Sequence, residues 1–139
     1  MKIPKVYYAH AMEQLKIPEE SGRRGRSAKE LLGKDFEVLL PEDWQENLTR
    51  ETILDIDLSK LDSADIVIGD LWHQGREING KFVQAQGTLM ELGYAMAKRK
   101  FIVIISRFTK EHHPFHFGAH KIVHSLDEAC EYIKETYKG

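Results

Sequence analysis

Carboxyl groups are the side chains of this sequence best suited to chemistry, and they gather in two segments. Glu91 stands three residues after Thr88 in a strongly helical segment, and Asp55 and Asp57 precede an apolar run that ends at Asp70. A carboxylate can act as a nucleophile and a carboxylic acid as a proton donor. A structural alternative is a capping box, in which Glu91 would only close a helix start after Thr88.

Short apolar runs alternate with helical segments along the chain. Runs rich in Val, Ile, Tyr and Phe predict five buried strands at residues 5–9, 36–40, 65–69, 101–106 and 121–124. Helices are predicted at residues 27–33, 44–62, 88–99 and 125–137. This alternation predicts a single domain, residues 1–139, with a flavodoxin-like or Rossmann-like α/β fold. The fold is a three-layer sandwich around a five-stranded parallel sheet, for which we expect the strand order 2-1-3-4-5.

Such a fold also predicts where a ligand binds. In open α/β sheets, ligands occupy the crevice beyond the carboxyl ends of the strands, at the switch point. That rule selects residues 9–12, residues 70–73 and the start of the helix that carries Glu91.

Composition narrows the function classes. The net charge is −2, so a general attraction to nucleic acid or to an anionic membrane is not indicated. The single Cys130 cannot form an internal disulfide, which favours a reducing compartment. No apolar run approaches the roughly 20 residues that span a bilayer, and the amino terminus lacks a signal-peptide pattern. We therefore expect a cytoplasmic protein without membrane or nucleic-acid partners.

Three sequence blocks together resemble the nucleoside 2-deoxyribosyltransferase family. The blocks are Gly-Thr-Leu-Met-Glu-Leu-Gly-Tyr-Ala at residues 87–95, residues 57–68, and Val-Tyr-Tyr-Ala at residues 6–9. They follow the family's order and spacing over most of residues 5–106. The related nucleoside 5′-monophosphate N-glycosidases share the same blocks.

The resemblance implies a role for several residues. Glu91 matches the nucleophile that attacks the anomeric carbon, Asp57 the acid that assists departure of the base, and Tyr7 the tyrosine that orients the nucleophile. An oxocarbenium-like transition state suits this chemistry, because a carboxylate beneath the sugar stabilises its charge and captures its carbon. The implied substrate is a nucleoside or nucleotide, with no cofactor. Further candidates for substrate contact are His10, Asp70, Trp72, Gly87 and Met90.

One position departs from the family pattern. Enzymes that act on free nucleosides place Asp six residues before the nucleophile, where this chain has Ala85. The absence of this aspartate permits a substrate phosphate group nearby, because a carboxylate at that position would repel it. The arginines of a predicted basic loop at residues 21–26 could contact that phosphate, or the loop could simply be solvated. We therefore predict that a nucleoside 5′-monophosphate is cleaved better than its nucleoside.

Other function classes stay open. Ala85 is also compatible with a nucleotide-binding module without turnover, and a nicotinamide-dinucleotide glycohydrolase would use similar chemistry. The histidines at residues 112–124 have no metal-ligand spacing, so no metal site is expected. The apolar residues Phe115 and Phe117 in the loop at residues 107–120 predict at least a dimer, in which His113 or His116 could reach a neighbouring site.

Overall fold

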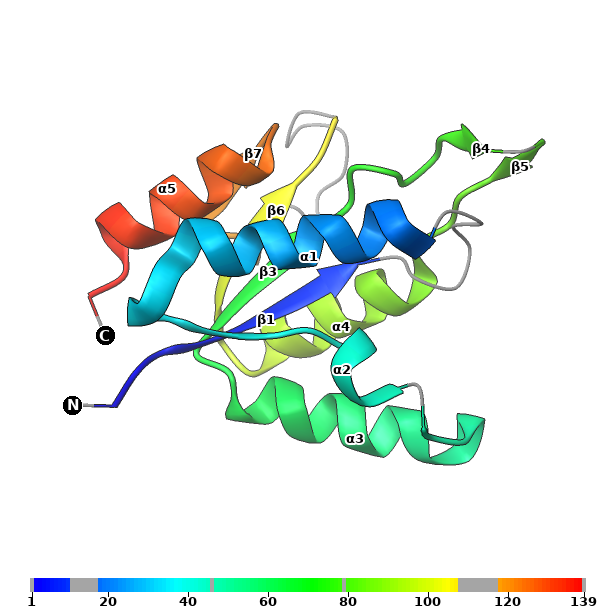
Figure 1. Cartoon of the computed structure of the whole chain (residues 1–139), viewed down its shortest axis with the longest axis horizontal. Coiled ribbons are helices and arrows are strands. Elements are labelled where there is room, and N and C mark those ends of the chain that lie inside the picture. The colour runs from blue at the N-terminus through cyan, green and yellow to red at the C-terminus, as the bar shows by residue number, and fades with distance from the viewer. Residues whose placement is uncertain (1, 11–17, 46, 79, 108–117, 139) are drawn as a thin grey trace.

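A five-stranded parallel sheet forms the centre of the molecule (Figure 1). The structure is a computed structural model and describes residues 2–10, 18–45, 47–78, 80–107 and 118–138. The strands lie in the order β2-β1-β3-β6-β7, which confirms the predicted topology. Their bounds are β1 (Lys5–His10), β2 (Glu37–Leu39), β3 (Ile66–Asp70), β6 (Phe101–Ile105) and β7 (Lys121–Val123).

Helices cover both faces of this sheet, which makes the predicted three layers (Figure 1). Helices α1 (Pro18–Leu32) and α5 (Leu126–Thr136) cover one face, and α3 (Arg50–Ser63) and α4 (Gln86–Ala97) the other. Strand β3 is buried along its whole length, as its continuous apolar sequence predicts. Side chains alternate along β1, so Tyr8 faces α1 and α5 whereas Tyr7 faces α3 and α4.

Two helix predictions are wrong in ways that matter for the site. The basic segment at residues 21–26 is not a loop but part of α1. Gly25 sits inside this helix because the helix passes close to the sheet edge, where a Cβ atom would lie 2.8 Å from Leu40 Cδ2. The single helix predicted at residues 44–62 is two helices, α2 (Glu42–Gln45) and α3.

The connections hold a few further elements. A short 3-10 helix, η1 (Gly33–Asp35), follows α1, and a hairpin of β4 (Glu77–Ile78) and β5 (Lys81–Phe82) lies between β3 and α4. The histidine-rich segment for which a dimer contact was predicted falls largely at residues 108–117, outside the described residues.

Helix α4 carries Glu91 and lies unusually close to the sheet. A Cβ atom at Gly69 would lie 2.5 Å from Leu92 Cδ2, so glycine permits this approach. The helix begins at Gln86, with Ala85 as the residue before its first turn. Because Thr88 is inside the helix rather than before it, the capping-box interpretation of Glu91 is wrong.

Helix α5 closes the opposite layer. Ser125 begins it, and its hydroxyl oxygen accepts a hydrogen bond from the Glu128 N–H at 3.1 Å. Cys130 on this helix is 1% exposed, and burial raises the pKa of its thiol to about 12. Within the described ranges, no helix is both long and apolar enough to cross a membrane.

Candidate active site

The structure brings together the three residues that the resemblance implicates in catalysis. Tyr7 lies in the middle of β1, Glu91 in the second turn of α4 and Asp57 in the middle of α3. The Tyr7 hydroxyl donates a hydrogen bond to Glu91 Oε2. Sheet and helices therefore place one carboxyl against a buried tyrosine, on the face that α3 and α4 cover.

Burial dominates the electrostatics of Glu91. Desolvation raises the pKa of its carboxyl from 4.5 to about 7, the hydrogen bond from Tyr7 opposes that shift, and the negative charge of Asp57 adds to it. The pKa of Tyr7 is also raised, first by burial and then by the charge of Glu91. Tyr7 thus keeps its proton and remains a donor to Glu91, whose carboxyl ionises near neutral pH.

Asp57 is held by two donors from α2. The indole Nε1–H of Trp44 donates to Asp57 Oδ1 at 2.8 Å, and the Gln45 side-chain amide donates to Oδ2 at 2.7 Å. The Trp44 ring also lies 6.0 Å from the Tyr7 ring, at an interplanar angle of 48°. One short helix therefore contacts both the tyrosine and the second carboxylate of the site.

Asp70 lies at the same end of the sheet but on the other face. It is 5% exposed, and its carboxylate accepts hydrogen bonds from the Tyr8 hydroxyl, from Arg24 Nε at 2.6 Å and from the Trp72 backbone N–H at 3.1 Å. Asp55 is exposed on α3. These three aspartates, Asp55, Asp57 and Asp70, therefore do not form the single acidic cluster that their closeness in sequence predicts.

His10 and Trp72 belong to the same face as Asp70. The His10 ring lies 5.1 Å from the Tyr8 ring, and His10 Nε2 is 3.0 Å from Glu42 Oε1. Trp72 is partly buried and packs against the core beneath α1 and α5. The structure does not bring these two predicted substrate contacts to the side chains of Tyr7 and Glu91.

The start of α4 offers an open surface beside Glu91. Gly87 and Met90 are both exposed there, Met90 by 73%. A Cβ atom at Gly87 would meet nothing within 4 Å. Ala85 is buried, and its N–H donates to the Gln74 side-chain oxygen at 2.6 Å. Both predicted contact residues thus remain accessible to a ligand.

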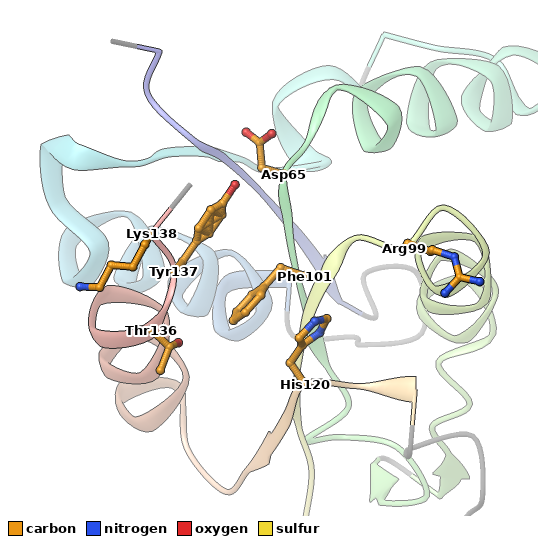
Figure 2. Close-up of a pocket in the computed structure, with 7 residues that line it drawn as sticks. All are labelled: Asp65, Arg99, Phe101, His120, Thr136, Tyr137 and Lys138. Atoms are coloured by element: carbon orange, nitrogen blue, oxygen red, sulfur yellow. The ribbon is translucent and has the colours of Figure 1, made fainter.

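A separate hollow lies at the opposite end of the sheet (Figure 2). Asp65 before β3, Phe101 at the start of β6 and Tyr137 after α5 line it. Arg99 and Lys138 lie on opposite sides of this hollow and point away from each other. Since its charged groups do not converge, we place the candidate active site at Glu91 instead.

Sequence reasoning missed the residues that surround the two carboxylates. The sequence predicts Trp44 and Gln45 only as the start of a helix, and it gives no sign that Tyr8 and Arg24 contact Asp70. The only available signal was the alternation of Tyr7 and Tyr8 along one strand, which places them on opposite faces. The partners of Asp57 come from another helix, so no local spacing reveals them.

The fold and these contacts define a flavodoxin-like α/β protein with a carboxylate–tyrosine site. No protein-family model matches the sequence. No curated protein matches it either.

Solved structures share the fold over nearly the whole chain. A 2-deoxyribosyltransferase from Leishmania mexicana has a TM-score of 0.70 at 22% identity, covering 97% of this chain and 99% of that one. The 2-deoxyribosyltransferase of Bacillus psychrosaccharolyticus has a TM-score of 0.61 at 20% identity, covering 96% and 92%. The CMP N-glycosidase BcmB of Clostridium botulinum has a TM-score of 0.62 at 16% identity, covering 94% and 98%. The chain is similar in fold to both kinds of enzyme.

Proposed function

We propose that this protein cleaves the N-glycosidic bond of a (deoxy)nucleoside or nucleotide through a glycosyl ester on Glu91. One observation carries the proposal: the partly buried carboxyl of Glu91, whose pKa desolvation raises to about 7, accepts a hydrogen bond from Tyr7 and lies close to the charge of Asp57. Perturbed carboxyl groups of this kind cluster at catalytic sites. The similarity in fold to deoxyribosyltransferases and to a CMP N-glycosidase supports this choice of chemistry.

The proposed reaction has two steps. Tyr7 occupies Glu91 Oε2, which leaves Oε1 to attack the anomeric carbon. As that bond forms, the carbon–nitrogen bond breaks, its electron pair moves to the base nitrogen, and Asp57 supplies the proton that the base needs. In the second step another base or water attacks the same carbon, releases the Glu91 carboxylate and returns a proton to Asp57.

The covalent intermediate can be tested directly. Brief reaction with a 2-fluoro-2-deoxy nucleoside, whose fluorine slows both steps by destabilising positive charge at the sugar, should leave a sugar adduct on Glu91. Mass spectrometry of a proteolytic digest would locate it. Stoichiometric release of base without any adduct would contradict the double displacement. Addition of a second base then separates transfer from hydrolysis, because only a transferase forms a new nucleoside.

The 5′ group of the substrate is a separate question. A nucleoside 5′-monophosphate N-glycosidase is favoured by Ala85, which puts no carboxylate at that position. The arginines give phosphate binding less support than the sequence predicts. Arg24 forms an ion pair with Asp70, and the charge of Arg26 lowers the pKa of Glu42, so both arginines already interact with carboxylates. Measuring kcat/KM for a deoxynucleoside and its 5′-monophosphate decides between them. We still predict a preference for the monophosphate, and a clear preference for the nucleoside would contradict it.

A non-catalytic nucleotide-binding module is the alternative from another class. The site gives this reading no specific support, because binding alone does not require a buried carboxyl with a raised pKa. Tight binding of a nucleotide with no release of base from any nucleoside or nucleotide would favour such a module over an enzyme.

A further inference from the structure

Trp44 contacts residues on both sides of the candidate site, Asp57 and Tyr7. Its indole N–H donates to Asp57 Oδ1 at 2.8 Å, and its ring lies beside that of Tyr7, the partner of Glu91. The Lys60 ammonium group on α3 lies 5.4 Å from the centre of the same ring. Contacts from β1 and α3 thus fix the plane of the indole, and with it the direction of its N–H.

An indole N–H can only donate a hydrogen bond, whereas an amide can donate or accept. Asp57 Oδ1 therefore faces a permanent donor, and no acidic proton can lie between it and Trp44. Oδ2 faces the Gln45 amide, which donates to the carboxylate and can turn to accept from the carboxylic acid. The two neighbours consequently distinguish the two oxygens: Trp44 holds Oδ1, and the exchangeable proton belongs on Oδ2.

From this geometry we infer that Trp44 is a positioning residue, which holds Asp57 so that Oδ2 delivers its proton to the leaving base. The inference rests on the proposed function. In the step concerned, Glu91 Oε1 bonds to the anomeric carbon, the carbon–nitrogen electron pair moves to the base, and the Oδ2 proton neutralises that nitrogen. Without the indole N–H, Asp57 can rotate and the proton is misdirected, while Glu91 keeps its place.

Leaving groups that differ in their need for a proton give the decisive test. An ordinary purine nucleoside requires protonation of its base, but an N7-methylated one already carries the positive charge and departs without a proton. Trp44→Phe keeps an aromatic ring beside Tyr7 and removes the hydrogen-bond donor to Asp57 Oδ1. It should lower kcat/KM about 10- to 100-fold for the ordinary nucleoside and by less than about threefold for the methylated one.

Two comparisons separate positioning from general damage. Tyr94→Phe is the matched control, because it removes another aromatic donor from an aspartate of α3, Asp62, at 2.8 Å on an exposed surface. It should leave both substrates unaffected. In an Asp57→Asn background, adding Trp44→Phe should cause no further loss on the ordinary nucleoside.

The outcomes are distinguishable. Equal losses on both substrates, or full additivity with Asp57→Asn, would overturn the inference while leaving the proposed function intact. If Trp44→Phe does not fold, judged by circular dichroism, Gln45→Met removes the other donor and should show the same selective loss on a smaller scale. Absence of wild-type turnover on every nucleoside and nucleotide would overturn the proposed function and this inference together.

Discussion

Tyr7 and Tyr8 are neighbours on β1, and their side chains lie on opposite faces of the sheet. The Tyr7 hydroxyl donates a hydrogen bond to Glu91, and the Tyr8 hydroxyl donates one to Asp70. Around Asp70 the pair is completed by the guanidinium of Arg24. Around Glu91 the nearby charge is that of another carboxylate, Asp57. The same two functional groups therefore make a charge-neutralised contact on one face and, on the other, the carboxyl that we propose as the nucleophile.

The difference teaches that a tyrosine partner alone does not activate a carboxyl group. A buried anion with a cationic partner is stabilised in place, and removing one member leaves an uncompensated charge. A buried carboxyl that faces a like charge keeps its proton more readily, so a small change in pH switches it to a nucleophile. The following variants test this contrast.

Replacing Glu91 should have the largest effect. Glu91→Gln should reduce kcat/KM by a factor on the order of 10⁴, because a nucleophile is lost. The Glu91 carboxyl has a pKa of about 7 in the folded protein, against an ordinary value of 4.5. As pH rises between these values, the carboxyl therefore increasingly disfavours folding. The variant should accordingly be more stable at pH 8 than the wild type, by on the order of 3 kcal/mol, and equally stable at pH 4.

Activity assays and urea unfolding at both pH values measure these effects. A loss of only a few-fold in kcat/KM would remove Glu91 from the mechanism. If the variant and the wild type were equally stable at pH 8 as well as at pH 4, burial would not raise the pKa of the Glu91 carboxyl.

Asp70→Asn should have the opposite profile. Removing the carboxylate leaves the partly buried Arg24 without its partner, which should lower the free energy of unfolding by about 3 kcal/mol. The folded protein should retain kcat/KM within a few-fold, since Asp70 lies on the other face. Unfolding curves and assays on the same preparation measure both quantities. An unchanged stability with a large catalytic loss would instead make Asp70 a substrate contact.

The two tyrosines provide a matched pair. Tyr7→Phe removes the hydrogen bond that lowers the pKa of Glu91, so the acidic limb of the kcat/KM profile, expected near pH 7, should move to higher pH. The rate on the plateau should fall about 10- to 100-fold, as expected for a hydrogen bond to a charged group. Tyr8→Phe should leave the profile in place and cost stability alone. A shift of equal size in both variants would erase the distinction between the faces.

Expressed as a free-energy change, the effect of Gly69→Ala should be the smallest of the four. Its added methyl group would meet Leu92 and push α4 away from the sheet, which displaces Glu91 from Tyr7. We expect roughly a tenfold loss in kcat/KM from such a displacement. Gly93→Ala is the control on the same helix, because its methyl group meets nothing within 4 Å and should stabilise the helix by up to about 1 kcal/mol. Equal activity of the two variants would show that the spacing of α4 is unimportant.

Much of the fold could be predicted because it is set by local patterns. Each of the five apolar runs became a strand of the sheet within one or two residues, and their alternation with helices fixed the parallel order. The beginning of α1 could not be predicted in this way. Its glycines look like loop residues in sequence, whereas Gly25 is required by contact with Leu40, which is distant along the chain.

The candidate site also has a part that the sequence predicts and a part that depends on contacts between distant segments. The positions of Tyr7, Asp57 and Glu91 follow from the resemblance and from the strand and helix that carry them. The environment that gives Glu91 its raised pKa, and the donors to Asp57, depend on how α2, α3 and α4 meet around β1. Likewise, the sequence predicts His10 and Trp72 at the crevice because they stand at the ends of strands. In the structure His10 contacts Tyr8, and Trp72 packs against the core on the other face.

The buried Cys130 provides a way to measure local opening of the native protein. Cys130 is the only cysteine of the sequence. It lies on α5, and its side chain packs into the core between this helix and the sheet. A reagent that modifies thiolates reaches it only when that layer detaches, so the labelling rate in native buffer measures how often detachment occurs. Because Cys130 and Glu91 lie on opposite faces, slower labelling in the presence of a nucleoside would report that ligand binding at one layer stabilises the other.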